Sequence, residues 1–172
     1  MKHTALAFAI AALLAGCNTS SNDSQAPSAA EQAYEYLVQL SSSAEGIGAR
    51  PTGTEAETRA AAWIQDHLTG WGYDVQKQPF TYTKSGADKA SQNLVAELKG
   101  QSDKVILIGA HYDSTGDKHG SEGATDNGAG VAALLAVAEA LKGQTLPYTV
   151  RFAFFGAEEN GLNGSKAYVA SL

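Results

Sequence analysis

The stretch VILIGAHYD, residues 105–113, decides the fold that the sequence predicts. Its first four residues are all apolar, which is typical of a strand buried on both faces of a sheet. Residues 149–155 form a second stretch that favours a buried strand. Between the two stretches, apolar residues recur at helical spacing: Val131, Leu134, Leu135, Ala138 and Leu141. Because a strand, a helix and a strand follow one another, the sequence predicts a right-handed crossover between parallel strands.

The residues upstream of this unit predict two helices. Residues 30–40 carry one apolar face and favour a helix, and a second helix runs from Thr54 until Gly70 ends it. Thr54 is a favourable N-cap, and Glu57 three residues later completes the sequence pattern of a capping box. Both helices are long enough to cover a sheet.

A β-hairpin is predicted between these helices and the crossover unit. Residues 75–83 and 93–98 favour strands, and a polar turn over residues 84–89 joins them. We expect the hairpin to extend the sheet as a mixed edge and residues 162–169 to begin a further helix. The predicted fold class is therefore α/β, a three-layer sandwich with a mixed, mostly parallel central sheet.

The N-terminus has the pattern of an export signal. Residues 1–16 have a short basic start and an apolar run too short to span a bilayer, and they end before Cys17 in a sequence that resembles the bacterial lipobox. We predict a lipoprotein signal peptide over 1–16, lipidation and membrane anchoring at Cys17, and a flexible tether over 17–29. The predicted location is the bacterial cell envelope, on the periplasmic face. Asn18 favours the outer membrane, since it is not the Asp that signals inner-membrane retention in some bacteria.

The composition fits one globular domain over residues 30–172. Of the 172 residues, 44% are hydrophobic, which is enough for a core, and the single cysteine excludes an intrachain disulfide. The formal net charge is −6, and Lys and Arg are scattered along the chain. A nucleic-acid partner is therefore not expected, because such a surface needs clustered basic residues.

Three polar clusters follow elements of the predicted sheet. His111 and Asp113 come directly after the first apolar strand, Glu158 and Glu159 come after the second, and Asp126 begins the helix between them. Ligands of open α/β sheets bind at the carboxyl ends of the strands. We therefore expect these five side chains to converge on one rim.

Each cluster also has a simpler interpretation. His111 is compatible with an ordinary strand-end histidine, Asp126 with a helix cap, and Glu158 and Glu159 with a solvated loop. Taken together, however, they crowd like charges at one edge without a Lys or Arg in the clusters. A divalent cation resolves that crowding, and the mixture of imidazole and carboxylate suits zinc best.

The spacing within the clusters suggests separate roles. Residues i and i+2 of an extended segment point to the same side, so Asp113 reaches behind His111 and fixes its tautomer. Glu158 and Glu159 project differently, so one is able to bind metal while the other holds a proton of water. Gly128 and Gly130 leave room for a substrate beside Asp126.

These residues resemble the M28 family of zinc aminopeptidases. The resemblance rests on three ordered motifs, GAHYD (109–113), ATDNGAG (124–130) and GAEENGLNGS (156–165), and on the segment GARPTGT (48–54). It implies a zinc-exopeptidase-like fold with two zinc ions per complete subunit. It also implies that His111 binds one zinc and Glu159 the other, that Asp126 bridges them, that Asp113 orients His111, and that Glu158 is the general base.

The chain departs from the family pattern after Glu159. The family requires two more ligands, an Asp after the next strand and a later His, and residues 160–172 contain neither type. His67 and His119 are interpreted as ordinary surface residues. We therefore expect the C-terminal part of the domain to be missing beyond Leu172, and this chain alone to bind zinc weakly and to be inactive.

The predicted activity of the complete protein is the removal of N-terminal residues from peptide substrates by a water that two zinc ions activate. The alternatives are a single-zinc enzyme like the glutaminyl cyclases, a carboxypeptidase specificity within the same family, and a catalytically inactive surface-anchored domain. The motifs at 127–130 and 161–165 favour the peptidase.

Overall fold

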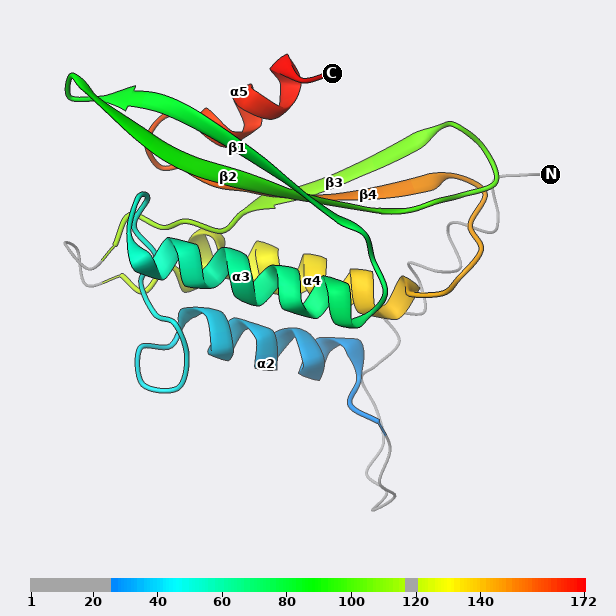
Figure 1. Cartoon of the computed structure of the whole chain (residues 1–172). Helices are drawn as coiled ribbons and strands as arrows, with labels where there is room; N and C mark the ends of the chain where they lie inside the picture. The colour runs from blue at the N-terminus through cyan, green and yellow to red at the C-terminus, as the bar shows by residue number, and fades with distance from the viewer. Residues whose placement is uncertain (1–25, 117–120) are drawn as a thin grey trace.

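The computed structural model describes residues 26–116 and 121–172. The predicted signal peptide, the lipidation site Cys17, most of the tether and His119 lie outside the described residues. None of the helices among the described residues is long and apolar enough to cross a membrane. Figure 1 shows one mixed sheet with helices on both sides.

Within residues 26–116 and 121–172, the sheet has four strands in the order β1-β2-β4-β3. They are β1 (Val75–Lys84), β2 (Ala87–Leu98), β3 (Val105–His111) and β4 (Thr149–Phe155). β3 and β4 pair in parallel, which confirms the crossover unit, whereas β1 with β2 and β2 with β4 pair antiparallel. The predicted mixed sheet is confirmed, but parallel pairing among the described strands is confined to β3 and β4, because the hairpin contributes both other pairs.

The hairpin turn is tighter than the sequence suggested. Ser85 and Gly86 alone join the two strands, with φ angles of 52° and 75° that suit a two-residue turn. Residues 87–89, predicted as turn, belong to β2 instead, and β2 also includes residues 90–92. Cross-strand hydrogen bonding holds them in the ladder, and their side chains are mostly exposed, so their polarity is compatible with a strand.

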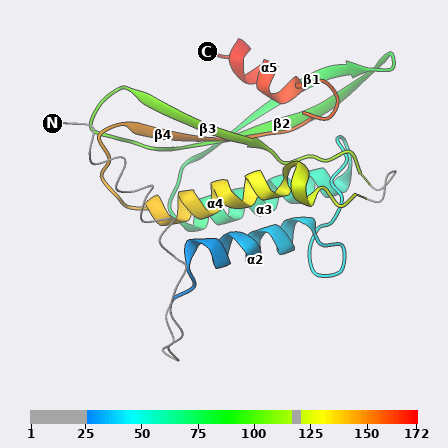
Figure 2. The ribbon, with the colours of Figure 1, turned by 180° about the vertical axis from the view of Figure 1, so that it is seen from behind.

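Helices cover the two faces of the sheet unequally. α3 (Glu55–Gly70) and α4 (Ala129–Leu141) lie on one face, with α2 (Ala29–Ser41) packed outside them against α4 (Figures 1 and 2). α5 (Asn163–Ala170) lies on the other face, over β1 and β2. α4 is apolar on nearly all sides because helices and the sheet surround it.

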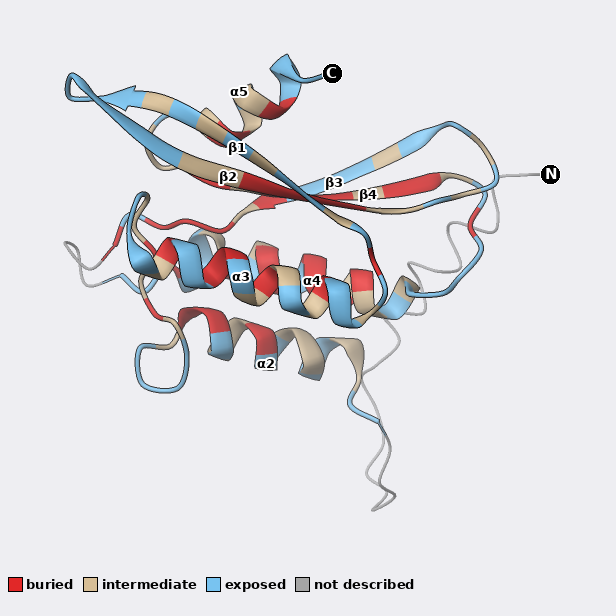
Figure 3. Ribbon diagram, in the orientation of Figure 1, coloured by how far each residue is buried: buried red, intermediate tan, exposed pale blue. Residues whose placement is uncertain are grey.

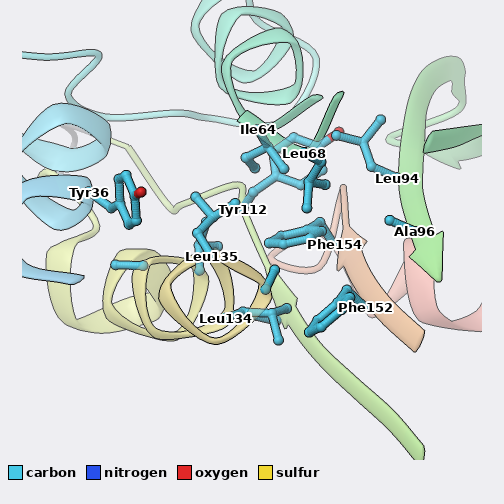
Figure 4. Close-up of a cluster of buried hydrophobic side chains, with 14 of the residues drawn as sticks. Tyr36, Ile64, Leu68, Leu94, Ala96, Tyr112, Leu134, Leu135, Phe152 and Phe154 are labelled. Atoms are coloured by element: carbon cyan, nitrogen blue, oxygen red, sulfur yellow. The ribbon is translucent and has the colours of Figure 1, made fainter. Parts of the chain in front are cut away.

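The main core lies between the sheet and α3 and α4. Phe152 and Phe154 of β4 point toward Ile64 and Leu68 of α3 and toward Leu135 of α4 (Figure 4). All five side chains are fully buried. This core fixes the sheet against the helices and so fixes the rim at which β3 and β4 end.

The prediction that β3 is buried on both faces is wrong. Val105, Leu107 and Ile108 are 44%, 48% and 37% exposed, whereas Phe152 and Phe154 of β4 are buried as predicted (Figure 3). β3 is an edge strand of the described sheet, and α5 lies over β1 and β2 instead. A run of apolar residues predicts a strand of the sheet, but it does not indicate which elements cover the two faces of that strand.

Arg50 is fully buried and joins four segments of the chain. Its guanidinium donates hydrogen bonds to the backbone carbonyls of Leu40 (3.2 Å), Gly48 (2.6 Å), Tyr112 (2.8 Å), Glu122 (3.0 Å) and Gly123 (2.8 Å). Burial lowers the pKa of Arg50 to about 10, partly opposed by the charge of Asp113, so the side chain stays protonated at neutral pH. It therefore ties the end of α2 to the end of β3 and to the segment that precedes Asp126.

Replacing Arg50 with Met is expected to destabilise the fold strongly. The substitution leaves several buried carbonyl groups without donors, and each costs roughly 1–3 kcal/mol. We predict a loss of at least about 3 kcal/mol in the free energy of unfolding, measured by urea denaturation in EDTA. Arg151→Met is the control, since Arg151 is a partly exposed partner of Glu97 and its removal should cost about 1 kcal/mol. Equal losses for the two variants would contradict the role of Arg50.

Candidate metal centre

The site lies at the rim where β3 and β4 end. His111 is the last residue of β3 and pairs in register with Phe155, the last residue of β4. Glu158 and Glu159 follow in the loop after β4. Asp126 lies in the short turn η2 (Ala124–Gly128) that leads into α4, and its backbone there is not helical. The predicted convergence of the clusters at the carboxyl ends of parallel strands is thus what the structure shows.

Three carboxylate side chains converge on His111 at this rim. Its Nε2 atom lies 3.0 Å from Oδ1 of Asp126 and 3.8 Å from Oε2 of Glu158. Donor atoms of His111, Glu158 and Glu159 all lie within 4.8 Å of one another. Asp126 touches this group through His111 only, and its side chain is 75% exposed. The structure therefore brings together the imidazole and the two glutamates most closely, with Asp126 at their outer edge.

The chemistry of this donor set fits a divalent cation. Oε1 of Glu159 is buried and has no hydrogen-bond partner among the described residues. Burial raises the pKa of Glu159, and the charge of Asp126 raises it further. A buried carboxylate oxygen without a partner, beside other carboxylates and an imidazole, has the surroundings that zinc ligands have.

Asp113 is the buried support of the site. Its carboxylate is fully buried and accepts hydrogen bonds from the backbone N–H of Glu158 (3.0 Å), the backbone N–H of Glu159 (3.1 Å) and the hydroxyl of Thr52 (2.8 Å). Nδ1 of His111 lies 3.5 Å from Oδ1 of Asp113 and 3.2 Å from its backbone carbonyl. Asp113 thus reaches behind His111 as its spacing predicts, and it also holds the loop after β4.

The charges around His111 favour its protonated form in the absence of metal. Burial opposes protonation, but the hydrogen bond with Asp113 and the charges of Asp113, Glu158 and Asp126 outweigh it and raise the pKa of His111 to about 9. Burial also opposes ionisation of Asp113, yet the contacts with His111, Thr52 and the loop N–H groups lower its pKa. The carboxylates around His111 therefore favour a positive charge at this centre.

Several supporting residues were not found from the sequence. The segment 48–57 supplies Arg50, Thr52 and Glu57, which contact all three site loops, whereas the sequence indicated only its resemblance to the family and a helix cap at Thr54 and Glu57. Contacts between residues so far apart in the chain cannot be predicted from the spacing of residues in the sequence. The proposed capping box is half correct: the Thr54 hydroxyl accepts from the Glu57 N–H (3.4 Å), but the Glu57 carboxylate accepts from Gly53 N–H (2.6 Å) instead.

Gly128 and His67 have different surroundings from those predicted. A Cβ atom on Gly128 would lie 2.2 Å from Oγ of Ser41, so this glycine allows α2 to approach the turn η2 and does not make room for a substrate. His67 is not an ordinary surface residue, because it packs half-buried among Tyr36, Trp63 and Trp71. None of these aromatic residues belongs to a site loop.

The pKa of His111 predicts a pH dependence for the protein stripped of metal. A raised pKa in the folded state means that stability is fully present below the unfolded value of about 6.5 and is lost as the pH approaches 9. In EDTA, we expect the free energy of unfolding to fall by about 1–3 kcal/mol between pH 6 and pH 9.5. His111→Gln should lack this decrease. Identical urea-denaturation profiles for wild type and variant would contradict the assignment.

Comparison with known proteins agrees with this geometry. The family model described as peptidase family M28 matches residues 93–172. The probable lipoprotein aminopeptidase LpqL of Mycobacterium tuberculosis is 45% identical over 92 residues, which cover 52% of this chain and 18% of that protein. Leupeptin-inactivating enzyme 1 of Streptomyces exfoliatus is 36% identical over 141 residues, 80% of this chain and 31% of that protein. The chain thus spans less than a third of the length of these two relatives.

Solved structures share the fold. BSAP, a zinc aminopeptidase from Bacillus subtilis, superimposes with a TM-score of 0.73 at 20% identity, covering 86% of this chain and 66% of that one. A glutaminyl cyclase from Fimbriiglobus ruber superimposes with a TM-score of 0.71 at 22% identity, covering 90% and 59%. At these identities the likeness concerns the fold. Residues 93–172, which hold the ordered motifs of the site, thus match peptidase family M28.

Proposed function

We propose that the full-length protein is a zinc-dependent aminopeptidase that removes N-terminal residues from peptides. The observation that carries the proposal is the convergence of His111, Glu158 and Glu159, with donor atoms within 4.8 Å of one another, at the carboxyl edge of parallel strands. The family match and the relatives named as aminopeptidases support it.

The donor set suggests how two zinc ions would be held. We assign His111 to one ion, Glu159 to the other and Asp126 to a bridging position. Support for Glu159 comes from its buried oxygen without a hydrogen-bond partner among the described residues, and support for Asp126 from its approach to Nε2 of His111. Asp113 orients His111 from behind, as outer carboxylates do in histidine–zinc sites.

Glu158 is the proposed general base. Its Oε2 atom faces the site 3.8 Å from Nε2 of His111, and its side chain is partly exposed, so water reaches it. When bound, zinc would supply a water of lowered pKa and polarise the scissile carbonyl. Glu158 takes a proton from the attacking water at Oε2 and passes it to the departing amine. The Asp113 contact to the Glu158 N–H keeps this carboxylate in place during both transfers.

The carboxylates also suit the free amine of a peptide substrate. Asp126 is largely exposed at the rim, and Glu158 and Glu159 lie behind it. An ammonium group at the substrate N-terminus would be attracted to the carboxylate oxygens that the zinc ions leave free. The relatives named as aminopeptidases favour an aminopeptidase over a carboxypeptidase.

A lipid anchor at Cys17 is proposed for the full-length protein. The lipobox-like sequence supports it, and so does the similarity to a relative named as a probable lipoprotein aminopeptidase. The domain would then act on peptides at the bacterial cell envelope, on the periplasmic face, with the outer membrane favoured.

The reaction product separates the proposal from its nearest alternative. The full-length protein loaded with zinc should release free amino acids from the N-termini of short peptides and lose this activity in EDTA. A product carrying a pyroglutamyl group from a peptide that begins with Gln would favour the glutaminyl cyclase function. Neither product from a zinc-loaded, folded protein would favour the inactive surface-anchored domain. Chromatography of the released products, with and without added zinc, is the measurement.

Glu158 and Glu159 give a matched pair of variants because they are adjacent in one loop. Glu158→Gln should retain zinc and lower kcat by at least about 100-fold, since a general base contributes 10²–10⁴-fold. Glu159→Ala should lose zinc under dialysis that leaves the wild type loaded. Zinc content by atomic absorption and kcat on an aminoacyl substrate test both roles. Unchanged turnover for the first variant, or full zinc content for the second, would contradict its assignment.

A further inference from the structure

The loop that carries Glu158 and Glu159 is held from behind by two buried carboxylates. Asp113 accepts the backbone N–H groups of Glu158 and Glu159, and Glu57 accepts the N–H of Ala157 (3.3 Å). The backbone N–H groups of three consecutive residues thus donate hydrogen bonds to carboxylate oxygens. Ala157 adopts a positive φ of 53°, which is uncommon for a residue with a side chain and needs such outside support.

The two carboxylate oxygens of Glu57 accept hydrogen bonds from different parts of the chain. It is 4% exposed, and its Oε2 accepts from Gly53 N–H (2.6 Å) at the start of α3. Its Oε1 accepts from the hydroxyl of Ser91 on β2 (2.6 Å) and from Ala157 N–H. A residue that only capped α3 would not need the contacts of Oε1. Glu57 therefore connects the start of α3 with the loop after β4.

Thr52 adds a third contact from the same segment. Its hydroxyl donates to Oδ2 of Asp113 (2.8 Å), the oxygen that also accepts from Glu159 N–H. Thr52 lies five residues before Glu57, and the side chain is only partly buried. Neither Thr52 nor Glu57 contacts the side chains of His111, Asp126 or Glu159 through a hydrogen bond in the described residues. Both act on the backbone and on Asp113.

The loop that carries Glu158 and Glu159 needs this support because the negative charges at the rim repel one another. Asp126 and Glu158 both approach Nε2 of His111, and Oε1 of Glu159 is buried without a hydrogen-bond partner among the described residues. Without fixed anchors, repulsion among these carboxylates would move the loop outward before a metal ion binds. Charged acceptors form stronger hydrogen bonds to N–H groups than neutral ones and so resist that movement.

We propose that Thr52 and Glu57 are positioning residues that preset the metal centre by holding the Glu158–Glu159 loop against His111. The inference rests on the proposed zinc site, and it assigns a role to a segment that supplies no ligand. Its consequence is that removing either contact weakens zinc binding without removing a ligand. Losses of about 10- to 100-fold are typical when an outer partner of a metal ligand is removed.

Four variants of the full-length protein test this role. Glu57→Gln offers one acceptor oxygen where Glu57 offers two, so its amide group must face an N–H group. Thr52→Val keeps the shape of Thr52 and removes the hydroxyl, and Thr52→Ser restores it. Ser91→Ala is the matched control, because it removes another donor to the same Glu57 oxygen but leaves the Ala157 contact.

The zinc dissociation constant, measured by competition with a chromogenic chelator, is the main readout. The melting temperature in excess EDTA reports the stability of the fold separately. We expect zinc binding to weaken by about 10- to 100-fold in Glu57→Gln and Thr52→Val. Ser91→Ala and Thr52→Ser should stay within about threefold of wild type, whatever their melting temperatures. If Glu57→Gln does not fold, the comparison of zinc binding by Thr52→Val and Thr52→Ser tests the positioning role instead.

Three outcomes would overturn the inference, and they differ in whether they also contradict the proposed function. Tight zinc binding by wild type, Thr52→Val and any folded Glu57→Gln alike would contradict the positioning role alone. Absence of zinc binding by the wild-type protein would contradict the proposed function as well. Equal weakening in Ser91→Ala and Glu57→Gln would show that the effect follows general stability and would also overturn the positioning role.

Discussion

The buried carboxylate of Asp113 is the constraint on which the site depends. A charge with no solvent exposure is stable only when hydrogen bonds and opposite charge compensate it. Here the compensation comes from two loop N–H groups, the hydroxyl of Thr52 and the imidazole of His111. One side chain therefore joins the end of β3, the loop after β4 and the segment before α3, and none of these can shift without leaving a buried charge uncompensated.

The fold brings these partners to one place through the parallel pair of β3 and β4. β3 and β4 end level, with His111 opposite Phe155, so the residues that follow each strand meet at the same rim. The core of α3, α4 and β4 fixes the sheet, and Arg50 fixes the segments that precede α3 and η2. The core residues and Arg50 thus hold the carboxylates of the rim in place, and none of them is a proposed zinc ligand.

The sequence predicted the elements and the rim because both depend on local patterns. Helical spacing located α2, α3 and α4, and the position of His111 and Glu158 directly after two apolar strands located the site. The exposure of β3 was not predictable, because it depends on which elements cover the strand. The roles of Thr52 and Glu57 were hidden for a similar reason: their partners Asp113 and Ala157 lie far along the chain, and spacing carries no information about such contacts.

The central claim is that these residues form a zinc centre, and anomalous scattering from crystals of the full-length protein tests it most directly. Data collected on both sides of the zinc absorption edge should show a peak about 2.0–2.2 Å from Nε2 of His111 and from a carboxylate oxygen of Asp126. A second peak should lie at the same distance from Glu159. Zinc-soaked crystals with no peak at this rim, and with His111 still bonded to Asp126, would contradict the account.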